Sequence, residues 1–134
     1  MIGVLVVTHG SIGEALLTSA AQILGAAPQQ VATLSVWRQD DPDDLVLRAR
    51  ELLEGLDAGD GVLVLTDIFG ATPGNVVSRL LQDGRIEGVS GASLPMLLRV
   101  LTGRNGSLSA AVQRALSGGS EGVVHMNTDR CLDA

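Results

Sequence analysis

One histidine of this sequence stands where a buried strand should end. His9 follows the apolar segment Ile2–Val7 and lies between Thr8 and Gly10. A neutral imidazole is a nucleophile near pH 7, and the phosphoramidate that it forms is labile enough to pass its phosphoryl group onward. Gly10 lets the backbone turn without covering the ring. The pattern therefore favours phosphoryl transfer through His9, although a histidine that only fills a turn fits the same position.

An aspartate should end another strand at the same edge of the sheet. Asp67 comes directly after Thr66 and the apolar run Val62–Leu65. The first and third strands of a doubly wound sheet are commonly neighbours, which would bring Asp67 within reach of His9. A carboxylate that accepts from one imidazole nitrogen fixes the tautomer and leaves the other nitrogen's lone pair free. Alternatively, Asp67 only caps the turn that follows it.

The loop after Asp67 has residues that suit a phosphoryl group. Gly70 allows a close turn, Thr72 offers a hydroxyl and a possible N-cap, and Pro73 is typical of a first helical turn. Free N–H groups and the helix dipole at such a start attract anions. The spacing matches neither G-x-G-x-x-G nor G-x-x-x-x-G-K-[ST], so no motif supports a nucleotide site. The predicted phosphate-binding residues are Gly10, Ser11, Gly70, Ala71 and Thr72.

Strand and helix patterns alternate along the chain. Ser11 and Glu14 have the spacing of a capping box at the start of a helix that should end at Gly25. Alternation of this kind predicts an α/β fold, a doubly wound and mainly parallel four-stranded sheet with helices on both faces. The expected strands are Ile2–Val7, Val31–Val36, Val62–Leu65, Ile86–Val89 and a short final strand Gly122–Met126. Further helices should begin at Asp41-Pro42, at Thr72-Pro73, around Pro95, and at Ser107, the last continuing through Leu116.

Composition limits the kind of protein. The 134 residues suit one domain, and 15 acidic against 9 basic residues give a net charge of −6, which disfavours nucleic acid and anionic membrane surfaces as partners. No apolar stretch approaches the roughly 20 residues that span a bilayer, and the start lacks the charged region of a secretory signal. A single cysteine, Cys131, cannot form an internal disulfide, which fits a reducing compartment. We expect a cytoplasmic protein with one domain, residues 1–127, and a C-terminal tail, residues 128–134.

Taken in order, these motifs resemble enzyme IIA of the mannose family, a component of the bacterial phosphoenolpyruvate-dependent sugar phosphotransferase system. The resemblance covers nearly the whole chain at matching spacing. It rests on Thr8-His9-Gly10, Asp67, Gly70-Ala71-Thr72-Pro73-Gly74-Asn75, Leu94-Pro95-Met96-Leu97 and Glu121-Gly122-Val123.

The resemblance implies a protein-histidine phosphotransferase component with a phosphohistidine intermediate and no cofactor. His9 matches the phosphorylated histidine, Asp67 the residue that hydrogen-bonds it, and Thr72 a serine beside the phosphoryl group. The histidine phosphocarrier protein would be the donor and a IIB protein, on a separate chain, the acceptor. The family is a homodimer that exchanges its last strand, which would give Gly122–Met126 a purpose. Gly74 departs from the pattern because the family usually has a large aromatic residue there.

Two other functions remain open at this stage. A small metal chelatase can also begin with strand-His-Gly-Ser, but the second histidine, His125, falls in the predicted last strand. A non-enzymatic regulatory module would use the same fold to contact other proteins. Trp37, expected on the same edge as His9, is either an anchor for a partner or a ring that covers a helix end. Cys131 is interpreted as incidental.

Overall fold

The computed structural model describes residues 1–129, in which strands and helices alternate up to residue 101 and two further helices follow. The helix and strand boundaries lie within a few residues of those expected, apart from the end of the chain. The elements are β1 (Gly3–His9), α1 (Ile12–Leu24), β2 (Val31–Val36), α2 (Pro42–Leu56), β3 (Val62–Thr66), α3 (Thr72–Ser78), β4 (Ile86–Ser90), α4 (Leu94–Leu101), α5 (Leu108–Glu121) and α6 (Met126–Asp129).

The four strands form one parallel sheet in the order β2-β1-β3-β4. In the register of this sheet, His9 at the end of β1 pairs with Val36 at the end of β2, and Val7 pairs with Thr66 at the end of β3. The carboxyl ends of β2, β1 and β3 therefore lie side by side. The predicted doubly wound parallel sheet is confirmed, including the adjacency of the strands that carry His9 and Asp67.

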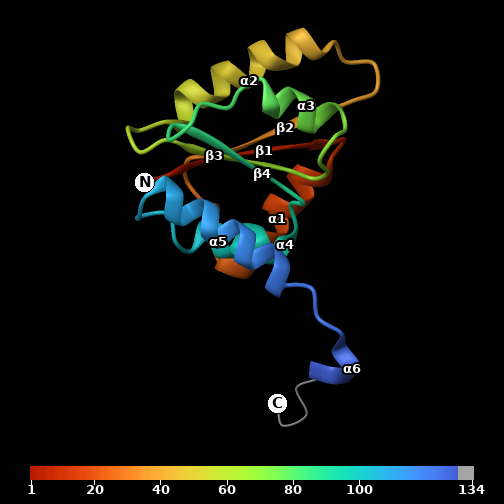
Figure 1. Ribbon diagram of the computed structural model, residues 1–134, viewed down its shortest axis with the longest axis vertical. Helices are drawn as coiled ribbons and strands as arrows, with labels where there is room; N and C mark the ends of the chain where they lie inside the picture. The colour runs from red at the N-terminus through yellow and green to blue at the C-terminus, as the bar shows by residue number, and fades with distance from the viewer. Residues whose placement is uncertain (130–134) are drawn as a thin grey trace.

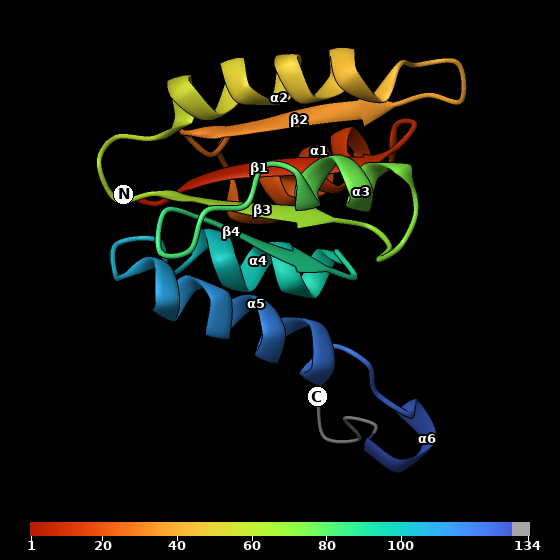
Figure 2. The same ribbon diagram turned by 45° about the horizontal axis from the view of Figure 1, so that its top comes forward.

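Helices cover both faces of the sheet. In Figures 1 and 2, α2 and α3 lie on one face, and α1, α4 and α5 lie on the other. Successive side chains of a strand point to opposite faces, so Leu5 and Val7 of β1 join the first core while Val4 and Val6 join the second. All four are at most 1% exposed. This two-sided aliphatic packing holds the end of β1, and with it His9, in a fixed place.

The start of α1 differs from the predicted capping box. Ser11 lies outside the extended backbone region that an N-cap needs and makes no side-chain cap hydrogen bond. The hydroxyl of Thr8, a residue only 1% exposed, accepts from the N–H of Gly13 at 2.8 Å instead. Glu14 accepts from the hydroxyl of Ser35 at 3.2 Å rather than reaching back to Ser11. The predicted capping box is wrong. The buried hydroxyl of Thr8 must find a hydrogen-bond partner, and it takes the N–H of Gly13 at the start of α1.

The cap of α2 matches the prediction. Asp41 has extended backbone and its carboxylate accepts from the N–H of Asp43 at 3.0 Å, and Pro42 is the first helical residue. Ser107 caps α5 as predicted, accepting from Ala110. The start of α3 shifts by one position, because Ala71 holds the N-cap place without a side-chain bond and Thr72 is already helical.

The end of the chain departs from the prediction. Helix α5 continues past Leu116 to Glu121, because Gly118 lets it approach α4 closely: a Cβ there would lie 3.2 Å from the Cα of Met96. The segment Gly122–Met126 forms no strand within this single chain, and its predicted exchange onto a partner chain stays a prediction. Gly122 keeps helical backbone angles, residues 123–125 belong to no helix or strand, and Met126 begins α6.

The last helix stands apart from the sheet. Figures 1 and 2 show α6 beyond the end of α5, joined to it by an extended connection. The predicted tail, residues 128–134, begins inside α6, and its residues 130–134, including Cys131, lie outside the described residues. Within residues 1–129, none of the helices has the length and apolar character needed to cross a membrane.

Candidate functional site

His9 and Asp67 form a hydrogen-bonded pair at the carboxyl edge of the sheet. The Nδ1 atom of His9 lies 2.9 Å from Oδ2 of Asp67, and the same oxygen accepts from the backbone N–H of His9 at 3.2 Å. An ionised carboxylate only accepts, so Nδ1 must carry the proton and Nε2 keeps its lone pair. The side chain of His9 is 48% exposed and that of Asp67 only 12%. The arrangement presents a nucleophilic nitrogen to solvent on a ring whose tautomer is fixed.

Gly10 turns the chain directly after the nucleophile. Its φ of 49° is in the left-handed region, and its N–H donates to the carbonyl of Val36 at 2.8 Å. A Cβ at this position would lie 3.2 Å from the ring of Trp37. The indole therefore packs against the backbone of Gly10 while remaining half-exposed. The ring therefore covers the turn at Gly10, and its role as an anchor for a partner stays a prediction.

A cleft of about 500 Å³ lies beside His9. It combines the nucleophile with Thr72, the first residue of α3, so the two predicted site residues from distant parts of the chain meet there. The rest of the lining comes from the end of β2, the loop that follows it and the first residue of α2. The cleft is lined by His9, Val36, Trp37, Arg38, Asp40, Pro42 and Thr72.

The remaining predicted phosphate-binding residues belong to the turns at the same edge. Ser11 is exposed at the start of α1, where its hydroxyl makes no cap bond. Gly70 has a φ of 87°, which glycine adopts without strain, and Ala71 precedes α3 with extended backbone. Gly70 and Ala71 lie in the segment that joins Asp67, at the end of β3, to the start of α3.

Gly74 has a structural reason to be small. It is buried, and a Cβ there would lie 2.9 Å from the carbonyl oxygen of Ile68, a backbone atom that can move only with the whole loop. The loop after β3 thus folds tightly onto α3. Its side chains face outward: Ile68 is 53% and Phe69 81% exposed. Apolar cover at this edge comes from the loop rather than from the position of Gly74.

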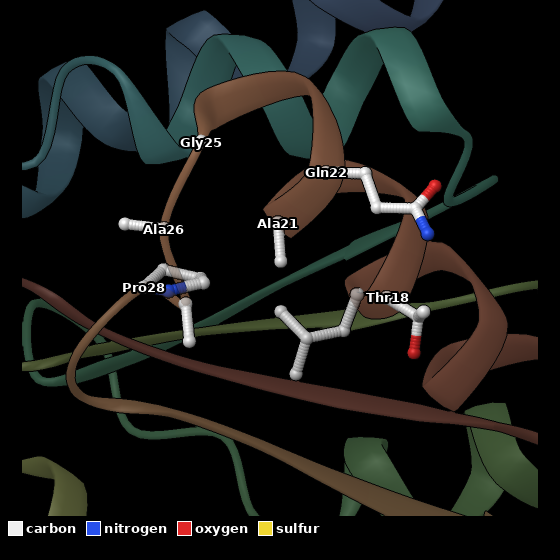
Figure 3. Close-up of a pocket in the computed structure, with 8 residues that line it drawn as sticks. Thr18, Ala21, Gln22, Gly25, Ala26 and Pro28 are labelled. Atoms are coloured by element: carbon white, nitrogen blue, oxygen red, sulfur yellow. The ribbon is translucent and has the colours of Figure 1, made fainter.

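Another hollow of the molecule lies away from this site. A cavity of about 650 Å³ runs along the second half of α1 and the connection to β2, from Leu17 to Pro28 (Figure 3). Figure 3 shows the polar side chains of Thr18 and Gln22 beside small apolar ones such as Ala21 and Ala26. No titratable group lines it. Because α1 runs back along the sheet, this cavity is far from the edge that carries His9.

The second histidine is separate from the candidate site in sequence and in its contacts. His125 is exposed in the connection before α6, and its Nδ1 lies 3.0 Å from the hydroxyl of Thr128. Among residues 1–129, no three side chains of His, Cys, Asp or Glu gather in a way that would hold a metal ion.

Sequence reasoning missed two residues of the site. Thr8 was considered only as a neighbour of His9, yet its hydroxyl fixes the first turn of α1 beside His9; a polar residue at the end of a buried strand was the available signal. Arg38 was passed over, yet it lines the cleft with His9 and Thr72. The sequence feature that could have identified Arg38 is its position two residues after a strand that ends at the same edge.

The fold and the histidine–carboxylate pair indicate a protein that reacts through a histidine nucleophile, and comparison with known proteins supports this class. The family model described as "PTS system fructose IIA component" matches residues 3–116. The chain is 32% identical over 125 residues to the mannose-specific EIIAB component of Escherichia coli (strain K12), with 91% of this chain and 38% of that protein covered. It is 31% identical over 103 residues to the fructose-specific EIIA component of Bacillus subtilis (strain 168), covering 76% of this chain and 70% of that protein.

A solved structure shares the whole fold. The crystal structure of phosphotransferase system component EIIA from Streptococcus agalactiae superposes with a TM-score of 0.85 at 27% identity, covering 96% of this chain and all of that one. The chain spans about 38% of the length of the E. coli relative it matches. It belongs to the mannose-family IIA components of the sugar phosphotransferase system, and this membership supports a phosphocarrier role.

Proposed function

We propose that this chain accepts a phosphoryl group on Nε2 of His9 from the histidine phosphocarrier protein and passes it to a IIB protein on a separate chain. One observation carries the proposal: the 2.9 Å contact of His9 Nδ1 with Asp67 leaves Nε2 free on a half-exposed ring. The family match makes phosphoryl transfer the chemistry that fits this nucleophile best.

The proposed step is a direct exchange between two imidazoles. The lone pair on Nε2 of His9 attacks the phosphorus of the donor's phosphohistidine in line, the donor's P–N bond breaks, and the donor ring keeps that electron pair. The Nδ1 proton stays on His9 and donates to Asp67, which balances the positive charge that develops on the ring. The step uses neither a metal ion nor a nucleotide, and fixed geometry supplies most of the catalysis. Transfer to the IIB acceptor is the reverse exchange.

Residues around the cleft suit the oxygens of the phosphoryl group. In this proposal, the hydroxyl of Thr72 donates a hydrogen bond to one of them, which is supported by its exposure and its place in the same cleft as His9. The backbone turns at Gly10-Ser11 and Gly70-Ala71 supply further N–H groups. The threonine replaces the serine of the family pattern and keeps the donor hydroxyl.

Exposed apolar side chains around His9 form the proposed docking surface for the donor and acceptor. Aromatic residues are enriched where partners bind most strongly. Four large apolar side chains are 47–81% exposed on the segments that follow β1, β2 and β3, and these are Ile12, Trp37, Ile68 and Phe69. We propose that both partners contact these residues in turn, because both must reach the same Nε2 atom.

A homodimer with exchanged C-terminal segments is the proposed assembly. The outer edge of β4 pairs with no other strand in residues 1–129, and an apolar groove of about 340 Å³ runs beside it, lined in part by Phe69, Leu81 and Leu116. Val123, Val124 and Met126 of the connection after α5 are 84%, 49% and 74% exposed. A partner's residues 122–126, added as a strand to β4, would cover both surfaces. Sedimentation of the full chain should give a dimer that Val124→Asp converts to monomer, and a monomeric wild-type chain at micromolar concentration would end this proposal.

The domain division and the location complete the proposal. We assign residues 1–127 to one phosphocarrier domain and place the protein in the cytoplasm. The family match over residues 3–116 supports the first assignment. The presence of one cysteine in the sequence, which excludes an internal disulfide, supports the second.

Labelling with phosphoenolpyruvate, enzyme I and the histidine phosphocarrier protein tests the proposed function. Intact mass should rise by about 80 Da, the replacement of a hydrogen by a phosphoryl unit, and the gain should be lost in acid. His9→Ala should abolish it. His125→Ala is the matched control, because it removes the only other histidine, and it should label like the wild type. Acid-labile phosphate on His9→Ala would show that His9 is not the acceptor.

A further inference from the structure

The cleft beside His9 has one permanent cation, Arg38. Its other titratable lining residues are His9 and Asp40, and the remaining ones are apolar or hydroxyl side chains. Within residues 1–129, the guanidinium of Arg38 makes no hydrogen bond or ion pair, whereas Arg79, Arg85 and Arg99 are each paired with a carboxylate. An uncommitted arginine that lines the cleft of the nucleophile is available for a ligand.

The backbone that carries Arg38 is fixed relative to His9. β2 ends at Val36, which pairs with His9 in the sheet and accepts from the N–H of Gly10. The next residue, Trp37, packs its ring against Gly10 and donates its N–H to Oδ2 of Asp40 at 2.8 Å. The N–H of Asp40 returns to the carbonyl of Trp37 at 3.0 Å, which closes a tight turn around Arg38. The side chain of Arg38 could therefore reach a phosphoryl group on His9 without a movement of the backbone.

A phosphoryl group carried by His9 would bring negative charge into this cleft, and a cationic side chain would stabilise it. A phosphoryl group on an imidazole has up to two negative charges, and the carboxylates of Asp67 and Asp40 already lie at this site. The whole chain is acidic as well, at −6. The carboxylate of Asp40 already accepts from Trp37, so it does not need Arg38 as a partner. A guanidinium can bind two phosphoryl oxygens at once with parallel N–H bonds.

We propose that Arg38 binds the non-transferring oxygens of the phosphoryl group carried by His9 and so stabilises the phosphorylated form. This inference rests on the proposed function, and it adds a residue that the family motifs at His9, Asp67 and Thr72 do not include. Arg38 acts beside the reacting atoms: it leaves the attack by Nε2 unchanged and offsets the charge that arrives with the phosphoryl group.

The equilibrium of transfer separates this role from simple docking. A residue that only helps the donor protein to dock speeds transfer in both directions and leaves the equilibrium unchanged. A residue that contacts the phosphoryl group on His9 shifts the distribution of phosphate between the donor and this chain. Arg38→Ala should lower the phosphorylated fraction relative to the donor by about tenfold, and Arg38→Lys, which keeps the charge but not the fork, should fall between.

A matched control exists on the neighbouring helix. Arg48 is exposed on α2, makes no ion pair within residues 1–129 and does not line the cleft of His9. Arg48→Ala removes the same charge from the same acidic chain, so it should leave the equilibrium unchanged. Equal shifts in Arg38→Ala and Arg48→Ala would mean that only overall charge matters, and an unchanged equilibrium in Arg38→Ala would overturn the contact.

Chemical phosphorylation with phosphoramidate provides a second, independent measurement. This small donor transfers its phosphoryl group to Nε2 with release of ammonia, the P–N bond of the reagent breaking as the new one forms, and it has no protein surface to dock. At equal concentrations of phosphoramidate and ammonia, Arg38→Ala should again reach a ratio of phosphorylated to free chain about tenfold lower than Arg48→Ala. Equal ratios would refute the inference. Labelling of His9 by phosphoramidate but not by the phosphocarrier protein would refute the proposed function and still test Arg38.

Discussion

Removal of the Asp67 carboxylate tests how far the orientation of His9 limits transfer. Asp67 Oδ2 accepts from both Nδ1 and the backbone N–H of His9, at 2.9 and 3.2 Å. Hydrogen bonds to a charged group contribute about 1.5–3 kcal/mol net, and the exposed half of the imidazole brings the Nδ1 bond toward the lower end. At about 1.4 kcal/mol for each factor of ten, Asp67→Ala should slow phosphorylation about 10- to 100-fold. Asp67→Asn keeps an acceptor without the charge and should be slowed by about tenfold or less.

Stability should change much less than rate. The other carboxylate oxygen, Oδ1 of Asp67, is buried without a hydrogen-bond partner in the described residues, so the alanine variant also removes an unfavourable group. The melting temperature should fall by no more than a few degrees, because a loss of 1 kcal/mol shifts a domain of this size by about 2–6 °C. This separation of rate from stability is what distinguishes an orienting residue from a structural one.

The assay is single-turnover labelling of His9 with excess phosphorylated donor, quenched in alkali to preserve the phosphoramidate. Asp83→Ala, at an exposed position in the connection before β4, is the control for loss of one negative charge. It should label at the wild-type rate. If Asp67→Ala labels within a factor of two of this control, the hydrogen bond does not limit transfer and the assigned role of Asp67 is wrong.

Three further predictions concern the turn beside His9 and the far end of the sheet. Gly10→Ala should cost about 1–2 kcal/mol in denaturant unfolding, since it forces a side chain into the left-handed region and against Trp37. Trp37→Ala should raise the KM for the donor several-fold and leave kcat unchanged, if the half-exposed ring is an anchor; an unchanged KM with a lower melting temperature would make it a cover only. The N–H of Gly59 above all, with help from Arg85, holds the pKa of Asp57 below its ordinary value of 3.8, against partial burial that raises it. Asp57→Asn should therefore destabilise the protein above about pH 3.8, and the difference in melting temperature should vanish as the pH falls through the lowered pKa.

The sequence predicted the fold because its elements are locally defined. Each buried strand is a short aliphatic run, and the turns between elements have polar or glycine residues such as Asp41 and Gly25 at their boundaries. Once the strands are parallel, topology alone brings their carboxyl ends to one edge. That rule made contact between His9 and Asp67 possible, and the family resemblance implied it.

The features that the sequence did not predict depend on competition between hydrogen-bonding and packing partners within the chain. Ser11 has the spacing of an N-cap, but the buried Thr8 must satisfy its own hydroxyl and takes the N–H of Gly13. Gly118 lies in a run that disfavours helix, yet α5 continues through it because the missing side chain allows contact with α4. Both outcomes depend on tertiary contacts that no local pattern contains. Arg38 was missed for a similar reason, since one exposed arginine in a loop has no motif.

The departure at Gly74 shows how this chain rearranges the cover of its site. An aromatic residue there would have to displace the backbone of Ile68, because a Cβ alone would already lie 2.9 Å from its carbonyl oxygen. With glycine, the loop after β3 folds close to α3 and turns Phe69 outward, where it is 81% exposed. Gly74, which stands where the family usually has an aromatic residue, thus permits a loop conformation in which the aromatic side chain of Phe69 is exposed. In the proposed docking surface, the apolar contact on this side of His9 comes from Phe69, on a loop whose close approach to α3 requires that glycine.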